Sequence, residues 1–161
     1  MTPHPPTDDL RELVARLGRL EDERAIYRLM CRYGEALDYG LDDQLVDLFT
    51  PTATWSLCRG GQVVKSVSGA AALRSWCAGH SRSPADVHKH VVTNVRIEVH
   101  GDRAAVTSYF ARLDANRERR ASFVYEMGRY RDRVVRCDDG SWRFDERIVE
   151  GEDNREHRVS G

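Results

Sequence analysis

Three side chains could together move a proton: Asp38, His90 and Tyr33. Carboxylates and imidazoles are common general acids and bases, and a phenol can donate a hydrogen bond to a carbonyl oxygen on which negative charge develops. Tyr33 and Asp38 belong to one predicted helix, Asp38 at its end, whereas His90 lies in a later predicted strand. If the fold brings the three together, we expect catalysis by proton transfer.

Each of the three also has a simpler explanation. Asp38 could be a surface residue at a helix end beside Gly40, and the Tyr33 ring could serve core packing alone. His90 could be an ordinary hydrogen-bonded strand histidine, an explanation that fits His88 better than His90. The sequence leaves these alternatives open.

Signals for other kinds of chemistry are weaker. One His-x-His pair, His88 and His90, is too common to indicate a metal. The four cysteines form no Cys-x-x-Cys pair, and neither a phosphate-binding glycine loop nor a nucleophile elbow is present. We therefore expect no metal and no cofactor.

The first half of the chain has helical periodicity. Leu10, Leu13, Val14 and Leu17 predict a short amphipathic helix, which Gly18 would stop or hinge,. A second helix is expected from Glu21 to Gly40. Further elements follow: a short helix over 41–49 closed by Pro51, a hairpin over 52–67, and a helix through Ala71 to Trp76,.

The second half of the chain is typical of long strands. They are expected at about 88–100, 103–114, 122–136 and 141–150, joined by short glycine-bearing turns,. Alternation on the first of them places two sets of side chains on opposite faces: His88, His90, Val92 and Asn94 against Val91, Val95, Ile97 and Val99. The first set could line a pocket.

This order of elements predicts an α+β fold. Helices segregated from an antiparallel sheet can be wrapped by a strongly curved sheet that leaves a cavity. We expect one domain over 10–150, a flexible N-terminal tail over 1–9 and a polar C-terminal tail over 151–161,. Apolar and aromatic side chains on the pocket-forming elements, together with one amide, are candidate substrate-binding residues: Phe49, Trp55, Trp76, Asn94, Tyr109, Tyr125 and Met127.

Composition narrows the class of partner. The chain has 25 basic and 26 acidic residues, so no global field attracts nucleic acid,. No apolar run approaches the roughly 20 residues of a membrane span, and the first residues lack the regions of a signal peptide. We expect a cytoplasmic protein that binds neither nucleic acid nor membrane and takes a hydrophobic small molecule as its substrate.

Several segments resemble SnoaL-like proteins of the nuclear transport factor 2-like superfamily. They are Arg24 to Gly40, Leu48 to Trp55, His88 to Ile97, Gly128 to Asp132 and Gly140 to Arg147. The resemblance covers roughly residues 20–150. It implies a cone-shaped α+β barrel, with N-terminal helices packed on a curved, mostly antiparallel sheet that encloses a pocket.

The resemblance also implies roles for individual residues. Asp38 and His90 match a catalytic aspartate and histidine of scytalone dehydratase, and Tyr33 matches the tyrosine that holds the oxyanion in ketosteroid isomerase. The ketosteroid isomerase base falls at about Leu57, and the second histidine of the dehydratase falls near Asn116. A strict scytalone dehydratase is therefore not expected.

The function that fits both the residues and the resemblance is that of a cofactor-independent lyase, isomerase or cyclase. It would act by general acid-base proton transfer on a polyketide-like or aromatic molecule. One alternative is a non-catalytic binding or scaffolding subunit, similar to a dioxygenase β subunit, and another is a hydrolase similar to an epoxide hydrolase. In each case we expect a homodimer through the open sheet face, with Gly128 to Arg133 as candidate surface.

Overall fold

The computed structural model describes residues 6–80, 82, 87–116 and 121–152. The expected N-terminal tail lies partly outside this range, and its residues from Pro6 onward form the start of a helix. Most of the expected C-terminal tail, 153–161, also lies outside it. Within the described part, no helix combines the length and apolarity needed to cross a bilayer.

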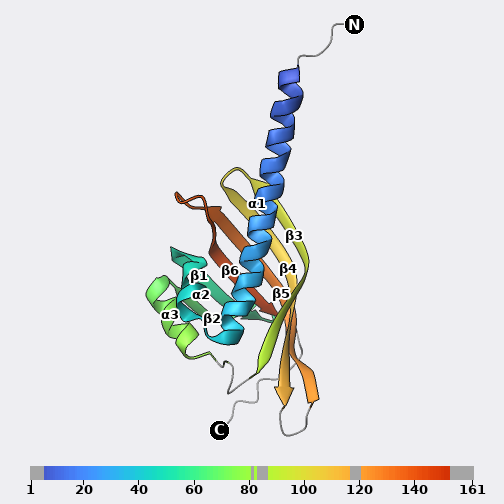
Figure 1. The fold of residues 1–161 in the computed structure, drawn as a ribbon. Helices are drawn as coiled ribbons and strands as arrows, with labels where there is room; N and C mark the ends of the chain where they lie inside the picture. Colours follow the sequence, from blue (N-terminus) through green and yellow to red (C-terminus); the bar gives the residue numbers. More distant parts are fainter. Residues whose placement is uncertain (1–5, 81, 83–86, 117–120, 153–161) are drawn as a thin grey trace.

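Helix α1 runs without interruption from Pro6 to Tyr39. The expected break at Gly18 is wrong: this glycine lies inside the helix, with open space where a side chain would be. A single glycine lowers helix stability by only about 1 kcal/mol, which the turns on either side can outweigh. The C-terminal half of α1 packs on the sheet through Ile26, Met30 and Tyr33, while its N-terminal half extends beyond the body (Figure 1).

The remaining elements follow the expected order with shifted ends. They are α2 (Asp42–Asp47), β1 (Phe49–Arg59), β2 (Gln62–Ser68), α3 (Ala70–Ala78), β3 (His88–His100), β4 (Arg103–Asn116), β5 (Ala121–Arg136) and β6 (Trp142–Gly151). Gly40, at a φ of 65°, follows the end of α1, where a left-handed residue turns the chain away from the helix,.

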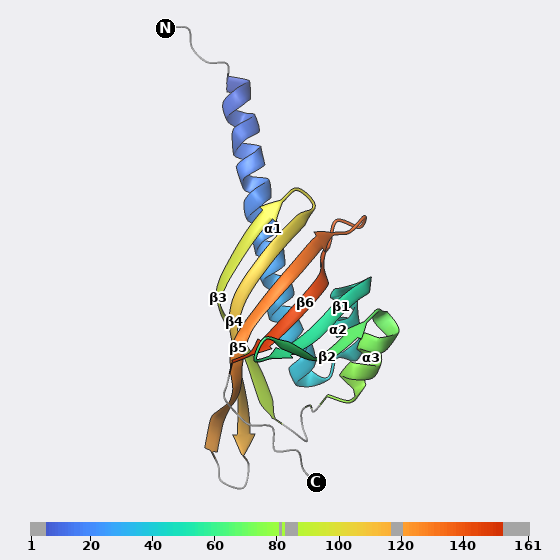
Figure 2. The same cartoon turned by 180° about the vertical axis from the view of Figure 1, so that it is seen from behind.

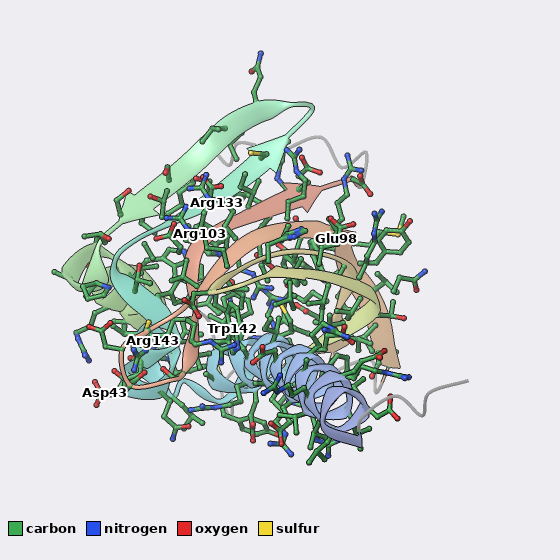
Figure 3. All side chains as sticks on the ribbon, turned by 90° about the horizontal axis from the view of Figure 1, so that it is seen from above. Asp43, Glu98, Arg103, Arg133, Trp142 and Arg143 are labelled. Atoms are coloured by element: carbon green, nitrogen blue, oxygen red, sulfur yellow. The ribbon has the colours of Figure 1, made fainter. Side chains whose placement is uncertain are left out.

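The six strands form one mixed sheet in the order β2-β1-β6-β5-β4-β3. All neighbours are antiparallel except β1 and β6, which are parallel. Figure 2 shows the sheet from its outer side, and Figure 3 shows it curving over α1. The fold class is therefore α+β, as expected, with the helix on the concave face of an open sheet.

An irregularity in β3 changes which side chains face α1. Asn94 has a φ of 52°, and pairing with β4 shifts between Thr93 and Arg96. Because an extra residue reverses the alternation beyond it, Val95, Ile97 and Val99 pack toward the core on the same side as His88,. The expected placement of these three residues opposite His88 and His90 is wrong.

Candidate functional site

The end of α1 and the start of β3 meet in a buried carboxylate-imidazole pair. Asp38 is 3% exposed, and its Oδ1 lies 2.6 Å from Nδ1 of His90. The backbone N–H of His90 donates to the other carboxylate oxygen at 3.1 Å. These two hydrogen bonds, one to the ring and one to the backbone of His90, fix the orientation and the position of its imidazole. With Asp38 ionised, Nδ1 carries the proton and Nε2 presents a lone pair.

Two other residues of β3 surround the same carboxylate. Nε2 of the buried His88 lies 3.5 Å from Oδ1 of Asp38. The Lys89 ammonium, which also packs on the Tyr39 ring, lies 4.0 Å from Oδ2. Asp38 is therefore a buried acceptor that faces two imidazoles and one ammonium, and the expectation of a surface aspartate does not hold.

A glycine one turn before Asp38 allows this approach. Gly34 and Asp38 share a face of α1, and a Cβ at Gly34 would lie 3.3 Å from both Cβ and the carbonyl oxygen of His90,. Such contacts are tighter than ordinary packing. The close approach of β3 to the helix thus depends on the missing side chain.

A third histidine, which the sequence reasoning did not single out, lies beside the pair. The His80 ring centroid is 5.5 Å from that of His88 and 6.1 Å from that of His90. Burial, with a further contribution from the neighbouring His90, lowers the pKa of His80 to about 4, so the His80 ring is neutral at pH 7,. Within the described residues, its buried Nε2 has no hydrogen-bond partner.

A row of rings leads from this cluster to Tyr33. The ring centroid of Trp76 lies 5.8 Å from that of His80 and 4.2 Å from that of Trp55. The indole N–H of Trp55 donates to the Tyr33 hydroxyl, with 2.9 Å between nitrogen and oxygen. Burial raises the pKa of Tyr33 to about 12 against the opposing effect of the nearby Arg147 guanidinium. The phenol therefore stays protonated and retains a proton to donate.

The sequence reasoning also missed a buried ion pair beneath Tyr33. Nε and Nη2 of Arg147 donate to the two carboxylate oxygens of Asp132 at 2.9 and 3.0 Å. The guanidinium carbon lies 3.9 Å from the Tyr33 centroid and 4.1 Å from that of Tyr130. The rings of Tyr33 and Tyr130 pack on this ion pair, and the contact with the guanidinium fixes the orientation of the Tyr33 ring.

The predicted substrate-binding residues lie in four different environments. Trp55 and Trp76 belong to the row of rings, whereas Phe49 is core, 5.1 Å from Phe144. Tyr125 is exposed and lies under the Arg112 guanidinium, whose charge also acts on His80.

Three others must be corrected. Asn94 is exposed at the irregularity of β3, and its side-chain oxygen accepts a hydrogen bond from Thr93. Tyr109 and Met127 are both 55% exposed and alternate with the inward-facing Phe110 and Gly128,. They lie on the outer face of the sheet, so the structure does not bring these three to the histidine cluster.

The site also contains a set of donors that could hold a metal. One ligand atom each of Asp38, His88 and His90 lies within 4.8 Å of the others. Two nitrogens and a carboxylate oxygen suit a divalent transition metal. The 2.6 Å contact between Asp38 and His90 is, however, a hydrogen-bond distance, and it engages two of these donor atoms with a proton,.

Residues 18–148 match the SnoaL-like domain. The chain belongs to the SnoaL-like family. The match by itself assigns no activity. No curated protein matches the sequence.

Solved structures agree with this assignment. An NTF2-like protein with a cystatin-like fold from Novosphingobium aromaticivorans is 25% identical, with a TM-score of 0.80 over 92% of this SnoaL-like chain and 93% of the other. A protein provisionally assigned as a scytalone dehydratase from the same organism is 24% identical, with a TM-score of 0.70 over 89% and 92%. ActVI-ORFA from Streptomyces coelicolor is 15% identical, with a TM-score of 0.70 over 81% and 96%. The last two show the fold alone.

Proposed function

We propose that this SnoaL-like protein is a cofactor-independent lyase, isomerase or cyclase that moves a proton beside a carbonyl group of an aromatic or polyketide-like molecule. The observation that carries the proposal is the buried pair of Asp38 and His90, with 2.6 Å between carboxylate and imidazole. A carboxylate that holds one ring nitrogen leaves the other nitrogen to act as the base.

The proton transfer follows from that geometry. For a β-hydroxy ketone, Nε2 of His90 takes the proton on the carbon beside the carbonyl, and the electrons of that C–H bond form an enolate. As the carbonyl re-forms, the bond from the β carbon to its hydroxyl breaks, and His90 returns the proton to the departing oxygen to give water. Asp38 stabilises the imidazolium that exists between the two steps.

Tyr33 is proposed as the donor to the enolate oxygen. Its hydroxyl accepts a hydrogen bond from Trp55, so its own proton is not used in that bond. The raised pKa, about 12, keeps that proton on the phenol. A neutral donor held by a buried ring resembles other oxyanion-stabilising groups.

The row of rings favours a flat substrate. Trp55 and Trp76 lie 4.2 Å apart at 32°, and His80 continues the row toward His90. Aromatic side chains interact with a planar ligand through ring faces and edges. We therefore propose bicyclic aromatic ketones as the first substrates to test.

The experiment measures exchange of the α-proton rather than a guessed product. Purified protein is incubated in D2O with 3-hydroxy-1-tetralone and with 1-tetralone, and deuterium incorporation and water loss are followed by NMR. We expect protein-dependent exchange that His90→Gln and Asp38→Asn each lower by roughly 100-fold or more. Chelator should leave the rate unchanged.

Matched variants separate chemistry from folding. His100→Gln removes an exposed histidine from the same strand, and Asp47→Asn removes an exposed carboxylate from α2. Both should retain the full exchange rate. Equal exchange in His90→Gln and His100→Gln would rule out His90 as the base.

A second candidate function is a binding or scaffolding subunit, and one observation favours it. Apolar side chains on the outer face of β3 to β5, among them Val91, Tyr109 and Met127, border a hollow that protein could fill,. In that case a dedicated partner should co-purify in fixed ratio. Met127→Asp should release it, whereas Asp38→Asn should not.

A further inference from the structure

Helix α1 carries a second apolar stripe, far from the site. Leu10, Leu13, Leu17 and Leu20 are 61, 61, 54 and 62% exposed. They lie in the N-terminal half of α1, which projects from the body (Figure 1). Four exposed leucines on one helix face are an unusual surface for a protein that stays alone.

The chain's own sheet cannot cover this stripe. Leu17 and Ile26 are nine residues apart, which is about two and a half helical turns. Ile26 is fully buried against the sheet, so Leu17 points to the opposite side of the helix. Because the described residues leave all four leucines more than half exposed, we take the occupant to be another molecule.

The spacing of the stripe selects a helix as occupant. The intervals between the leucines are three, four and three residues, which is the a and d pattern of a heptad,. Side chains at these positions form the seam of a coiled coil, and the equally exposed Val14 flanks this seam at an e position,. A helix with the same pattern fits the seam.

Flanking charges select a second copy of this chain, in parallel orientation. In a parallel pair the g position of each heptad meets the following e position of the other helix. Arg16 then faces the partner's Glu21, and Glu23 faces the partner's Arg28; all four side chains are exposed. Symmetry repeats both pairs, giving four attractive contacts against one contact of like charge, between Arg24 at the next a position and the partner's Arg24,.

The antiparallel alternative brings like charges together. With Leu10 opposite the partner's Leu20, the g positions meet each other. Arg16 then faces the partner's Arg16, and Asp9 faces the partner's Glu23. Charge complementarity therefore distinguishes the two orientations.

We infer that the leucine stripe Leu10 to Leu20 of α1 is a self-association surface, which pairs in parallel with the same stripe of a second copy. Because the stripe points away from its own sheet, the two bodies lie on opposite sides of the helix pair. The candidate acid-base site stays outside this contact. The inference is independent of the proposed function and of the sheet face considered above.

The test is sedimentation velocity of the full chain over a range of concentrations. The unaltered protein should dimerise, and Leu13→Glu with Leu17→Glu should weaken the dimer by roughly 100-fold or more, because charged groups would enter the seam. The matched control is Val63→Glu with Val64→Glu, which alters two equally exposed residues of β2 and should change nothing. Unchanged near-UV circular dichroism spectra would show that the body is intact in all variants.

Charge reversal and cross-linking test the orientation. Arg16→Glu should weaken the dimer about threefold to tenfold, and adding Glu21→Arg should restore it. In a Cys31→Ser background, Leu20→Cys should form a disulfide with its counterpart under mild oxidation, since equivalent d positions meet only in a parallel pair.

Three results would overturn the inference. One is a protein that stays monomeric at all concentrations, and another is a dimer that the stripe variant leaves intact but Met127→Asp dissociates. The third is a Leu20→Cys variant that fails to cross-link while Leu10→Cys with Leu20→Cys succeeds, which would indicate antiparallel helices.

Discussion

Tyr33 is the residue at which packing and proposed chemistry meet. Its hydroxyl accepts from Trp55, and its ring covers the Arg147 guanidinium. Tyr33→Phe keeps the ring and removes the proposed donor. We expect α-proton exchange to fall by roughly 100-fold and the free energy of unfolding to fall by about 1–3 kcal/mol, because the buried indole N–H loses its acceptor.

Tyr130→Phe is the control for that change. Tyr130 is equally buried and also lies against Arg147, but it has no part in the proposed reaction. Exchange at the normal rate in Tyr130→Phe, with a loss in Tyr33→Phe, would support the donor role. An equal loss in both would indicate that the rings act only by packing.

His80 predicts a pH dependence of stability. Its pKa is lowered from 6.5 to about 4 by burial, so the unfolded chain binds the proton more readily than the folded one. The stabilisation is fully present above pH 6.5 and is lost as the pH falls toward 4, by roughly 3 kcal/mol in all. Urea unfolding from pH 7 to pH 4 should show a shallower loss in His80→Gln; parallel curves would contradict the prediction.

Sequence patterns found Asp38 and His90 but not His80 or Arg147, for physical reasons. His80 follows the last turn of α3, in a segment whose sequence has no periodicity. The only sequence signal that relates His80 to the site is its position four residues after Trp76. Arg147 has the strand parity of the half-exposed Arg143. The pairing of β6 with β5 shifts between Arg133 and Val134, and this shift turns Arg147 inward,.

At the scale of the elements, the contact between α1 and β3 depends on a glycine. Gly34→Ala would place Cβ 3.3 Å from His90, and β3 would have to move by a few tenths of an ångström. Ala also favours the helix by about 1 kcal/mol, so the free energy of unfolding should change little. We expect the exchange rate to fall about tenfold, since the fixed ring is displaced.

Gly18→Ala provides the matched control for this element. It lies in the same helix with open space around it. Thermal unfolding should show a gain of about 0.5–1 kcal/mol with full exchange activity. If Gly34→Ala kept the full exchange rate as Gly18→Ala does, the close approach of Gly34 to His90 would not be needed for activity.

The buried ion pair of Asp132 and Arg147 joins facing residues of the paired strands β5 and β6. Asp132→Ala leaves a guanidinium without its counter-charge. We expect the free energy of unfolding to fall by about 3–5 kcal/mol, and Asp132→Leu with Arg147→Met to recover much of that loss. Arg133→Ala, next to it on the exposed face, should cost less than about 0.5 kcal/mol in the same urea titration.

At the scale of the whole molecule, element order was predictable and strand irregularities were not. Glycine turns and periodicity indicated the helices, the hairpin and the four later strands. The shift near Asn94 arises only when β3 pairs with β4, and it reversed the expected faces of Val95, Ile97 and Val99. The break expected at Gly18 was wrong because the low helix propensity of one glycine is a small effect compared with the stability of the long helix around it.

The position of β6 in the sheet has a consequence for synthesis. β6 is the last of the described strands in sequence, yet it lies between β1 and β5 and provides the parallel partner of β1. When the residues up to Asp139 have left the ribosome, the sheet therefore consists of two separate parts, β2-β1 and β5-β4-β3. In these parts β1 and β5 each expose an unpaired edge. Such long-range pairing is slow to form and open to aggregation.

We therefore expect the emergence of β6 from the ribosome, not local folding, to set the time at which this protein becomes compact. Chains arrested at Asp139 should be cleaved readily by protease, whereas chains with Gly151 outside the ribosome should be resistant. Resistance in the shorter chain would show that α1 and the first five strands fold without their central neighbour. The ten residues of β6 therefore set the time at which the exposed edges of β1 and β5, which could aggregate, become covered.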